Sequence, residues 1–108
     1  MLAAAFWLLL IATVGGVAMA ALDAAMRPLR IGHGVIAGAG LACLLVGAFM
    51  HPGTLVWSAF ALTAIGFSAG AVFFGVIYKH QAPPRILVLG HGALNALGVL
   101  LLAVAVFG

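Results

Sequence analysis

Residues 86–107 read ILVLGHGALNALGVLLLAVAVF, an uninterrupted apolar run without a charged side chain. A helix needs about 20 apolar residues to cross about 30 Å of hydrocarbon. Three other runs, at residues 2–22, 31–50 and 55–78, are similar in length and composition. Barrel strands would alternate apolar and polar residues instead. The sequence therefore predicts an all-α fold, a four-helix transmembrane bundle.

Composition places the whole chain in lipid. Of its 108 residues, 68% are hydrophobic and 5% are charged, whereas a soluble domain carries about 25% charged residues. Such a chain cannot cover itself with a water-compatible surface. We therefore predict that residues 1–108 form a single integral membrane domain in the lipid bilayer, and we expect no nucleic acid partner.

The connections between the four runs differ in charge. The connection HPGT, at residues 51–54, has no cation, and the first and third connections hold all the Lys and Arg residues of the chain: Arg27, Arg30, Lys79 and Arg85. Cytoplasmic loops are the ones that carry excess Lys and Arg. We therefore predict that both termini are periplasmic, in a bacterial inner membrane. The prolines and glycine of the connections are expected to stop the helices.

The second and fourth runs are similar to each other at an offset of 58, which places Gly-His-Gly (residues 32–34) on Gly-His-Gly (residues 90–92). Further matches at this offset are Arg27/Arg85, Gly40/Gly98, Leu44/Leu102, Val46/Val104 and Phe49/Phe107. The first and third runs match at an offset of 50, through Trp7/Trp57, Thr13/Thr63 and Gly16/Gly66. Both halves run in the same direction, so the sequence predicts two repeated hairpins, a parallel internal repeat.

This repeat puts His33 and His91 at matching depths on the second and fourth helices, near the basic connections. An ionisable side chain inside a membrane is a candidate functional residue, because it must face the interior and find a partner. Each histidine is followed seven residues later by a glycine, Gly40 or Gly98. Seven residues are nearly two helical turns, so each histidine is expected to head a stripe of small residues.

One interpretation of these residues is a haem site. Haem iron is held by axial histidines in many proteins, and Gly40 and Gly98 would make room for the macrocycle. The haem propionates would be paired by the basic residues Arg27, Arg30 and Arg85. The paired Gly-His-Gly resembles small membrane cytochromes, which implies heme b and one-electron transfer, as part of a membrane redox complex and with a quinone as a candidate partner.

Two other interpretations remain open. In the first, glycines simply let membrane helices approach closely, and the histidines only hydrogen-bond to carbonyls, hydroxyls or Asn95. The chain would then be an accessory subunit of a larger membrane complex, or a homo-oligomer. In the second, the interface between the two hairpins is the path of a small-solute channel or carrier.

The remaining histidines are expected to lie outside the haem site. His51 begins the connection at the opposite membrane face, where no second histidine accompanies it. His80 lies beside Lys79 and could join His33 and His91 in a three-histidine metal site, since imidazole suits zinc and copper. Missing carboxylate and thiolate ligands disfavour that site.

Several activities are disfavoured by missing residues. The length and helix number resemble the small multidrug resistance transporters, which depend on a membrane-embedded Glu, but this chain contains no Glu. Its one acid, Asp23, is expected to form an exposed ion pair with Arg27. No catalytic triad, phosphate-binding glycine loop or pair of carboxylates can be assembled, so we do not expect an enzyme acting alone.

Overall fold

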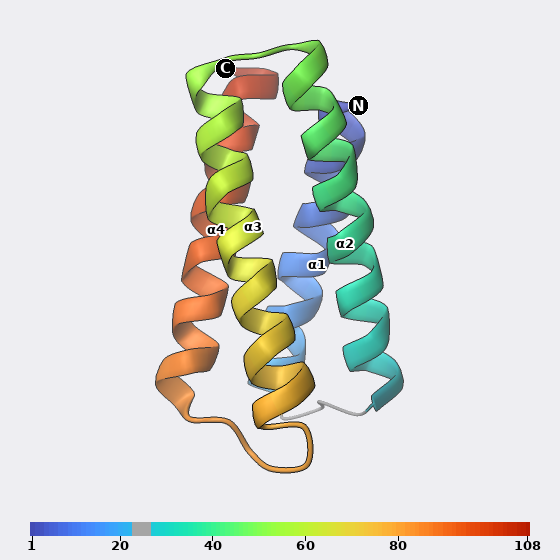
Figure 1. Cartoon of the computed structure of the whole chain (residues 1–108), viewed down its shortest axis with the longest axis vertical. Coiled ribbons are helices and arrows are strands. Elements are labelled where there is room, and N and C mark those ends of the chain that lie inside the picture. The colour runs from blue at the N-terminus through green and yellow to red at the C-terminus, as the bar shows by residue number, and fades with distance from the viewer. Residues whose placement is uncertain (23–26) are drawn as a thin grey trace.

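The structure is a computed structural model that describes residues 1–22 and 27–108. Its helices run alternately up and down the bundle and are α1 (Leu2–Ala21), α2 (Arg27–Met50), α3 (Thr54–Val72), the π-helical turn η1 (Phe73–Ile77) and α4 (Arg85–Phe107). The bundle measures 40 × 21 × 21 Å, and both termini lie at one end (Figure 1). The prediction of an all-α bundle is confirmed, because four helices are long and apolar enough to cross a membrane.

Helix α2 begins four residues earlier than the sequence predicted. The predicted start was residue 31, but the helix starts at Arg27 and includes Pro28 in its first turn. Proline is compatible with that position, because the first N–H groups of a helix have no intrahelical acceptor and proline has no N–H to leave unpaired. Pro28 therefore does not stop the helix. The expected ion pair between Asp23 and Arg27 involves a residue outside the described part of the chain.

The end of α3 changes its hydrogen-bond pattern. The backbone N–H of Tyr78 donates to the carbonyl of Phe73 at 2.7 Å, five residues earlier, which is the spacing of a π-helix. The sequence predicted one regular helix over residues 55–78.

Helix α4 starts at Arg85, directly after Pro84, whose carbonyl accepts the N–H of Leu87 at 3.0 Å.

The helices pack in ring order. The most extensive interfaces join α1 to α2 and α3 to α4, and smaller ones join α1 to α4 and α2 to α3. Helices α2 and α4, which carry the two Gly-His-Gly segments, therefore lie on a diagonal of the bundle. Side chains that project inward from these two helices meet along the central axis.

The hydrophobic core occupies only the half of the bundle near the termini. It consists of Ala5, Phe6, Leu9, Leu44, Ala48, Val56, Ala59, Val99 and Leu102. Among the described residues, none is buried in α1 after Ala12, in α2 before Gly40, in α3 or η1 after Gly66, or in α4 before Gly98. We call this second half the basic half, because Arg27, Arg30, Lys79 and Arg85 lie at its end.

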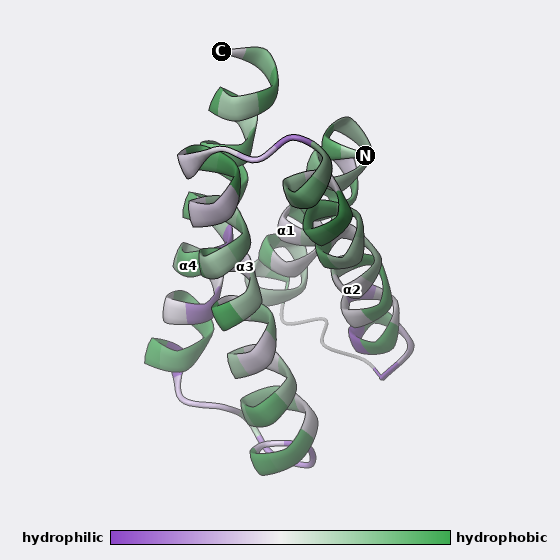
Figure 2. Ribbon diagram, turned by 45° about the horizontal axis from the view of Figure 1, so that its top comes forward, coloured by the Kyte–Doolittle hydropathy of each residue, from purple (hydrophilic) through white to green (hydrophobic). Residues whose placement is uncertain are grey.

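The outer surface of the helices is apolar. Large side chains such as Val35, Ile86 and Leu100 are 66%, 74% and 63% exposed, and hydrophobic residues colour all four helices, whereas hydrophilic colours gather at the connections and at a few inner positions (Figure 2). Exposed apolar faces of this extent suit contact with lipid tails. These faces are consistent with an integral membrane protein.

Candidate functional site: a histidine pair in the basic half

His33 from α2 and His91 from α4 meet inside the basic half. Their ring centroids are 6.3 Å apart, and the ring planes are inclined at 70°. Each ring is partly buried. The structure thus brings together the two histidines that the sequence placed at matching depths, across the diagonal of the bundle.

The ring of His91 is held by a hydrogen bond to α3. Its Nδ1 lies 2.8 Å from the carbonyl oxygen of Gly66. Because a carbonyl oxygen only accepts, Nδ1 is the nitrogen that carries the hydrogen, and Nε2 of the neutral ring keeps its lone pair. The hydrogen bond therefore fixes both the orientation and the tautomer of His91.

Two glycines of α3 make this contact possible. A Cβ atom at Gly70 would lie 2.5 Å from Cε1 of His91, and a Cβ at Gly66 would collide with the side chain of Asn95. Asn95 in turn donates from Nδ2 to the backbone carbonyl of His91 at 2.8 Å. Gly66 and Gly70 therefore let α3 and α4 approach closely, as small residues do in membranes. They also leave room for the polar side chains of His91 and Asn95 on α4.

An aromatic ring borders the site on the side of the basic end. The ring of Phe74, in η1, lies edge-on to the ring of His91, with centroids 5.2 Å apart and planes inclined at 84°. Edge-to-face packing of this kind restrains both rings. His91 is thus restrained by a hydrogen bond, a glycine surface and an aromatic edge.

His33 has a similar setting with one difference. A Cβ at Gly16 of α1 would lie 3.0 Å from Cε1 of His33, so this ring also rests against a glycine. However, Nδ1 of His33 is buried and has no hydrogen-bond partner among the described residues. Buried polar atoms are rarely left unpaired, and an exception calls for a ligand, water or functional role.

Matching contacts are made by residues of α1 and α3 whose numbers differ by 54. The comparison of the two sequences predicted a difference of 50. Gly40 contacts Leu9 and Gly98 contacts Thr63, while His33 contacts Gly16 and His91 contacts Gly70. Buried positions of α1 and α3 are related by the same offset through the pairs Ala5/Ala59, Leu9/Thr63 and Ala12/Gly66. Buried positions of α2 and α4 are related by an offset of 58 through the pairs Gly40/Gly98 and Leu44/Leu102.

Gly40 and Gly98 are buried, but they do not face each other. A Cβ at Gly40 would lie 2.8 Å from Cγ of Leu9, and one at Gly98 would lie 2.5 Å from Cγ2 of Thr63. Both glycines therefore give room to the neighbouring helix of their own hairpin. Their contacts are with α1 and α3 rather than with the space between α2 and α4.

The cations of the basic end have different environments. Arg30 donates from Nη1 to the carbonyl of Lys79 at 3.2 Å and from Nη2 to the carbonyl of Phe74. A cation that bonds the last carbonyls of a helix also interacts favourably with the helix dipole. Arg27 and Arg85 are exposed. Arg30 therefore fastens α2 to the end of α3, whereas the described contacts give Arg27 and Arg85 no such bond.

The other histidines do not join the site. His51 and His80 are exposed, and the described residues contain no cluster of three or more His, Cys, Asp or Glu side chains able to hold a metal ion. The interpretation of a three-histidine site with His80 is therefore wrong for this part of the chain. The connection after Tyr78 does not return His80 to the interior.

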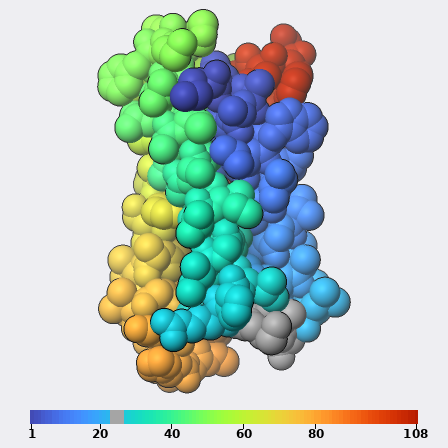
Figure 3. All heavy atoms as spheres, turned by 90° about the vertical axis from the view of Figure 1, so that its right-hand side faces the viewer, coloured from blue at the N-terminus to red at the C-terminus, as the bar shows by residue number. Residues whose placement is uncertain are grey.

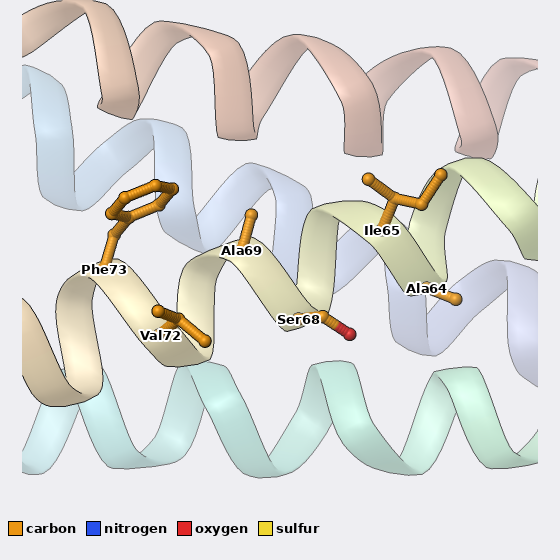
Figure 4. Close-up of a pocket in the computed structure, with 6 residues that line it drawn as sticks. All are labelled: Ala64, Ile65, Ser68, Ala69, Val72 and Phe73. Atoms are coloured by element: carbon orange, nitrogen blue, oxygen red, sulfur yellow. The ribbon is translucent and has the colours of Figure 1, made fainter.

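A shallow hollow of about 520 Å³ lies on the outer face of α3. It is lined by Ala64, Ile65, Ser68, Ala69, Val72 and Phe73, and Figure 4 shows these side chains along one helix. Its only polar side chain is the hydroxyl of Ser68, and it contains no ionisable group. We assign no chemistry to this surface.

Sequence reasoning missed the residues that position the histidines. Gly66, Gly70 and Phe74 act through contacts between α3 and α4, and nothing in their own spacing indicated which side chain they would meet. The carbonyl of Gly66 carries no sequence signal, because every residue has one. Small residues four positions apart, such as Gly66 and Gly70, are typical of close helix interfaces in membranes, but this spacing does not identify the partner.

The chain matches no protein-family model, and no curated protein or solved structure is significantly similar to it. The chemistry of the histidine pair must therefore be argued from its own geometry.

Proposed function

We propose that this protein is a small b-type membrane cytochrome in which His33 and His91 hold one haem. The observation that carries this proposal is the pair of imidazoles 6.3 Å apart on diagonal helices, in the half of the bundle where no described residue is buried. Histidines from facing helices are a common way to build a cofactor site inside a bundle.

The separation of the two rings suits two ligands of one metal. A metal–nitrogen bond of about 2 Å on each side, together with about 1 Å from each nitrogen to its ring centre, separates two ring centroids by about 6 Å. The observed centroids are 6.3 Å apart. The centroid separation therefore supports the proposal that one metal ion is held between the two histidines.

The number of ligands favours haem over a free ion. Structural and catalytic zinc sites use three or four protein ligands, and other divalent ions also prefer several. The described residues offer no third His, Cys, Asp or Glu beside the pair. In haem the porphyrin already supplies four nitrogen ligands, so two axial histidines complete the iron.

The hydrogen bond of His91 supports the same assignment. Metal-binding histidines usually donate their other ring N–H to a carbonyl or carboxylate, which sets the tautomer and makes the ligand more basic. His91 donates from Nδ1 to Gly66 over 2.8 Å and keeps Nε2 free for a metal. Gly16 and Gly70 support the two rings, and Phe74 borders His91.

When bound, a haem of this type supplies reversible one-electron transfer. The chain's own residues orient the two imidazoles: Gly16 and Gly70 support the rings, and the carbonyl of Gly66 accepts the hydrogen bond of His91. The exposed Arg27 and Arg85 are the cations that would pair with the carboxylates of the haem, because Arg30 already donates to two backbone carbonyls. The electron partner would be another membrane protein or a lipid-soluble carrier.

We further infer that the basic end faces the cytoplasm of a bacterial inner membrane and that both termini are periplasmic. This inference rests on the positive-inside rule and on the position of the four cations at one end. The matching contacts at offsets of 54 and 58 support the inference that the two hairpins are a parallel repeat.

The proposal is tested by expressing the full chain in haem-replete cells and recording the absorption spectrum of the purified protein. We expect a Soret band and the sharp visible bands of reduced, six-coordinate, low-spin iron. His33→Ala and His91→Ala should each remove or alter these bands, whereas His51→Ala, at the opposite end, should leave them unchanged. Folded protein without a Soret band would reject the proposal.

The hydrogen bonds of His91 also favour a second candidate, an accessory subunit in which the histidines are structural. In that case His91 simply ties α4 to the carbonyl of Gly66. His91→Gln would then be well tolerated, because an amide can also donate to a carbonyl. A colourless protein that keeps its stability in His91→Gln would support this candidate over the cytochrome.

A further inference from the structure

The two histidines are held to different degrees, although the two hairpins make matching contacts. Nδ1 of His91 lies 2.8 Å from the carbonyl oxygen of Gly66, whereas Nδ1 of His33 is buried and has no partner among the described residues. Helices α1 and α2, which carry Gly16 and His33, lie side by side on the face of the molecule shown in Figure 3. Helix α1 therefore contacts the ring of His33 but does not hydrogen-bond to its Nδ1.

The glycine contacts of the two rings differ as well. A Cβ at Gly70 would lie 2.5, 2.9 and 3.3 Å from Cε1, Nδ1 and Nε2 of His91. The corresponding distances from a Cβ at Gly16 to the ring of His33 are 3.0, 3.6 and 3.6 Å. The ring of His33 thus has the looser contact with the neighbouring helix.

The residues that restrain His91 have alanine counterparts in the first hairpin. When α1 is related to α3 by an offset of 54 and α2 to α4 by an offset of 58, the pairs are Ala12/Gly66, Ala20/Phe74 and Ala37/Asn95. An alanine side chain offers neither an aromatic edge nor a hydrogen-bonding group. The first hairpin therefore lacks the aromatic ring and the amide that accompany His91 in the second.

A hydrogen bond at the second ring nitrogen strengthens a histidine as a metal ligand. Such a bond fixes the tautomer in which the other nitrogen keeps its lone pair, and loss of a partner of this kind lowers metal affinity by about 10–100-fold. His91 has this support at Nδ1, and His33 lacks it. Of the two axial ligands of the proposed haem, His33 is therefore the weaker one.

The surroundings of the pair favour a small, uncharged molecule as a competitor of His33. The two ring centroids are only 6.3 Å apart, so a ligand that takes the place of one imidazole must be small. The described residues include no Asp or Glu side chain, and Arg30 already donates to two backbone carbonyls. An ion would lose its hydration inside the membrane, whereas an uncharged diatomic molecule can reach the site through the lipid.

We propose that His91 is the permanent ligand of the haem and that His33 is an exchangeable ligand, which gives way to a diatomic gas such as carbon monoxide. This proposal rests on the proposed function and deepens it, because it names a class of ligand for the same site. The exchange breaks the coordinate bond to Nε2 of His33 and forms one to the carbon atom of carbon monoxide. No electron is transferred in this step.

The test compares His33→Ala with His91→Ala, which are the same substitution at matching positions of the two hairpins. Haem is added to the haem-free full chain in lipid nanodiscs, and binding is followed by the Soret band. We expect the Kd for haem to be at least about tenfold higher in His91→Ala than in His33→Ala. Carbon monoxide should shift the Soret band of the dithionite-reduced wild type, and His33→Ala should bind it more tightly, because no imidazole competes.

A double variant transfers the setting of His91 to His33. Ala12→Gly together with Ala37→Asn introduces the counterparts of Gly66 and Asn95, and the glycine is needed because a Cβ at Gly66 would collide with Asn95. We expect the double variant to bind carbon monoxide about tenfold more weakly than the wild type. Ala12→Gly alone is the control, and its affinity should stay within about twofold of the wild type.

The outcomes separate this proposal from the proposed function. A protein with a Soret band whose two alanine variants lose haem affinity equally, or whose reduced wild type does not respond to carbon monoxide, would overturn the exchangeable ligand and leave the cytochrome in place. Unchanged affinity for carbon monoxide in a folded double variant would also overturn it, and if that variant does not fold, the two alanine variants decide. A protein that binds no haem would reject both proposals.

Discussion

Gly70→Ala is the substitution that most directly perturbs the setting of the histidine pair. The new methyl carbon would lie 2.5 Å from Cε1 and 2.9 Å from Nδ1 of His91. Non-bonded carbon atoms prefer about 3.5–4.0 Å, so the imidazole would have to move by about 1 Å. The ring cannot make this movement and also keep its 2.8 Å contact with the carbonyl of Gly66.

The expected cost has two parts. Loss of a neutral hydrogen bond costs about 0.5–1.5 kcal/mol, and extra volume in a packed contact costs about 1–3 kcal/mol. We therefore expect Gly70→Ala to lower the free energy of unfolding by about 1.5–4.5 kcal/mol. If haem is bound, the displaced His91 should also weaken the low-spin spectrum.

Two alanine variants serve as controls. In Gly16→Ala the methyl carbon would lie 3.0 Å from Cε1 of His33, and this ring has no hydrogen bond to lose, so we expect about 1 kcal/mol or less. In Gly92→Ala the methyl carbon would meet no atom within 4 Å, so we expect almost no change. Any gain in helix propensity, up to about 1 kcal/mol, is common to all three variants.

The assay is reversible unfolding in mixed micelles or by steric trapping, with helix content followed by circular dichroism. The predicted order of destabilisation is Gly70→Ala, then Gly16→Ala, then Gly92→Ala. Equal stability of the three variants would refute the reasoning, because it would show that His91 is not confined between Gly66 and Gly70.

Three further predictions concern the rest of the bundle. Gly98→Leu should destabilise the bundle by more than about 2 kcal/mol in the same unfolding assay, because Thr63 and the backbone of α3 leave no room for the side chain. Arg30→Gln should cost about 1–2 kcal/mol through loss of charged hydrogen bonds to the end of α3, whereas Arg27→Gln should stay within about 0.5 kcal/mol; equal effects would contradict the assigned contact. Reporter fusions should report residues 51–54 as periplasmic and residues 79–85 as cytoplasmic, and the opposite result would reverse the orientation.

The number and course of the helices were predictable, because apolar runs of this length have few alternatives in lipid. Their ends were less predictable. Pro28 was expected to stop a helix, yet it occupies the first turn, where a missing N–H costs nothing. At the end of α3, the carbonyls of Phe74 and Lys79 bond to Arg30 of another helix, so the shape of this end depends on a partner distant in sequence.

The contacts of the first and third helices did not follow the offset of 50 that identical residues suggested. The match of Thr13 with Thr63 favoured an offset of 50, but in the structure Thr63 contacts Gly98 as Leu9 contacts Gly40. A threonine can replace a leucine on a buried face because its hydroxyl bonds to its own helix. Oγ1 of Thr63 indeed donates to the carbonyl of Ala59 at 2.8 Å. Packing position, not residue identity, sets the register.

The histidine pair was predictable from equal depth on two helices, but its surroundings were not. Gly40 and Gly98 were expected to line the space between α2 and α4, yet they contact Leu9 and Thr63. Which face of a glycine-rich helix meets which neighbour depends on the ring order and crossing of the helices. The sequence pattern does not indicate which glycine-containing face meets which helix, because small residues lie on several faces of each helix.

The absorption spectrum of the dithionite-reduced, full-length protein tests the central claim most directly. Purification from haem-replete cells should yield one haem per chain, with the narrow visible bands of bis-histidine iron, and these bands should be lost or become high-spin in His33→Ala and in His91→Ala alike. A folded protein without haem, or a haem spectrum that neither substitution alters, would contradict the assignment of His33 and His91 as the haem ligands.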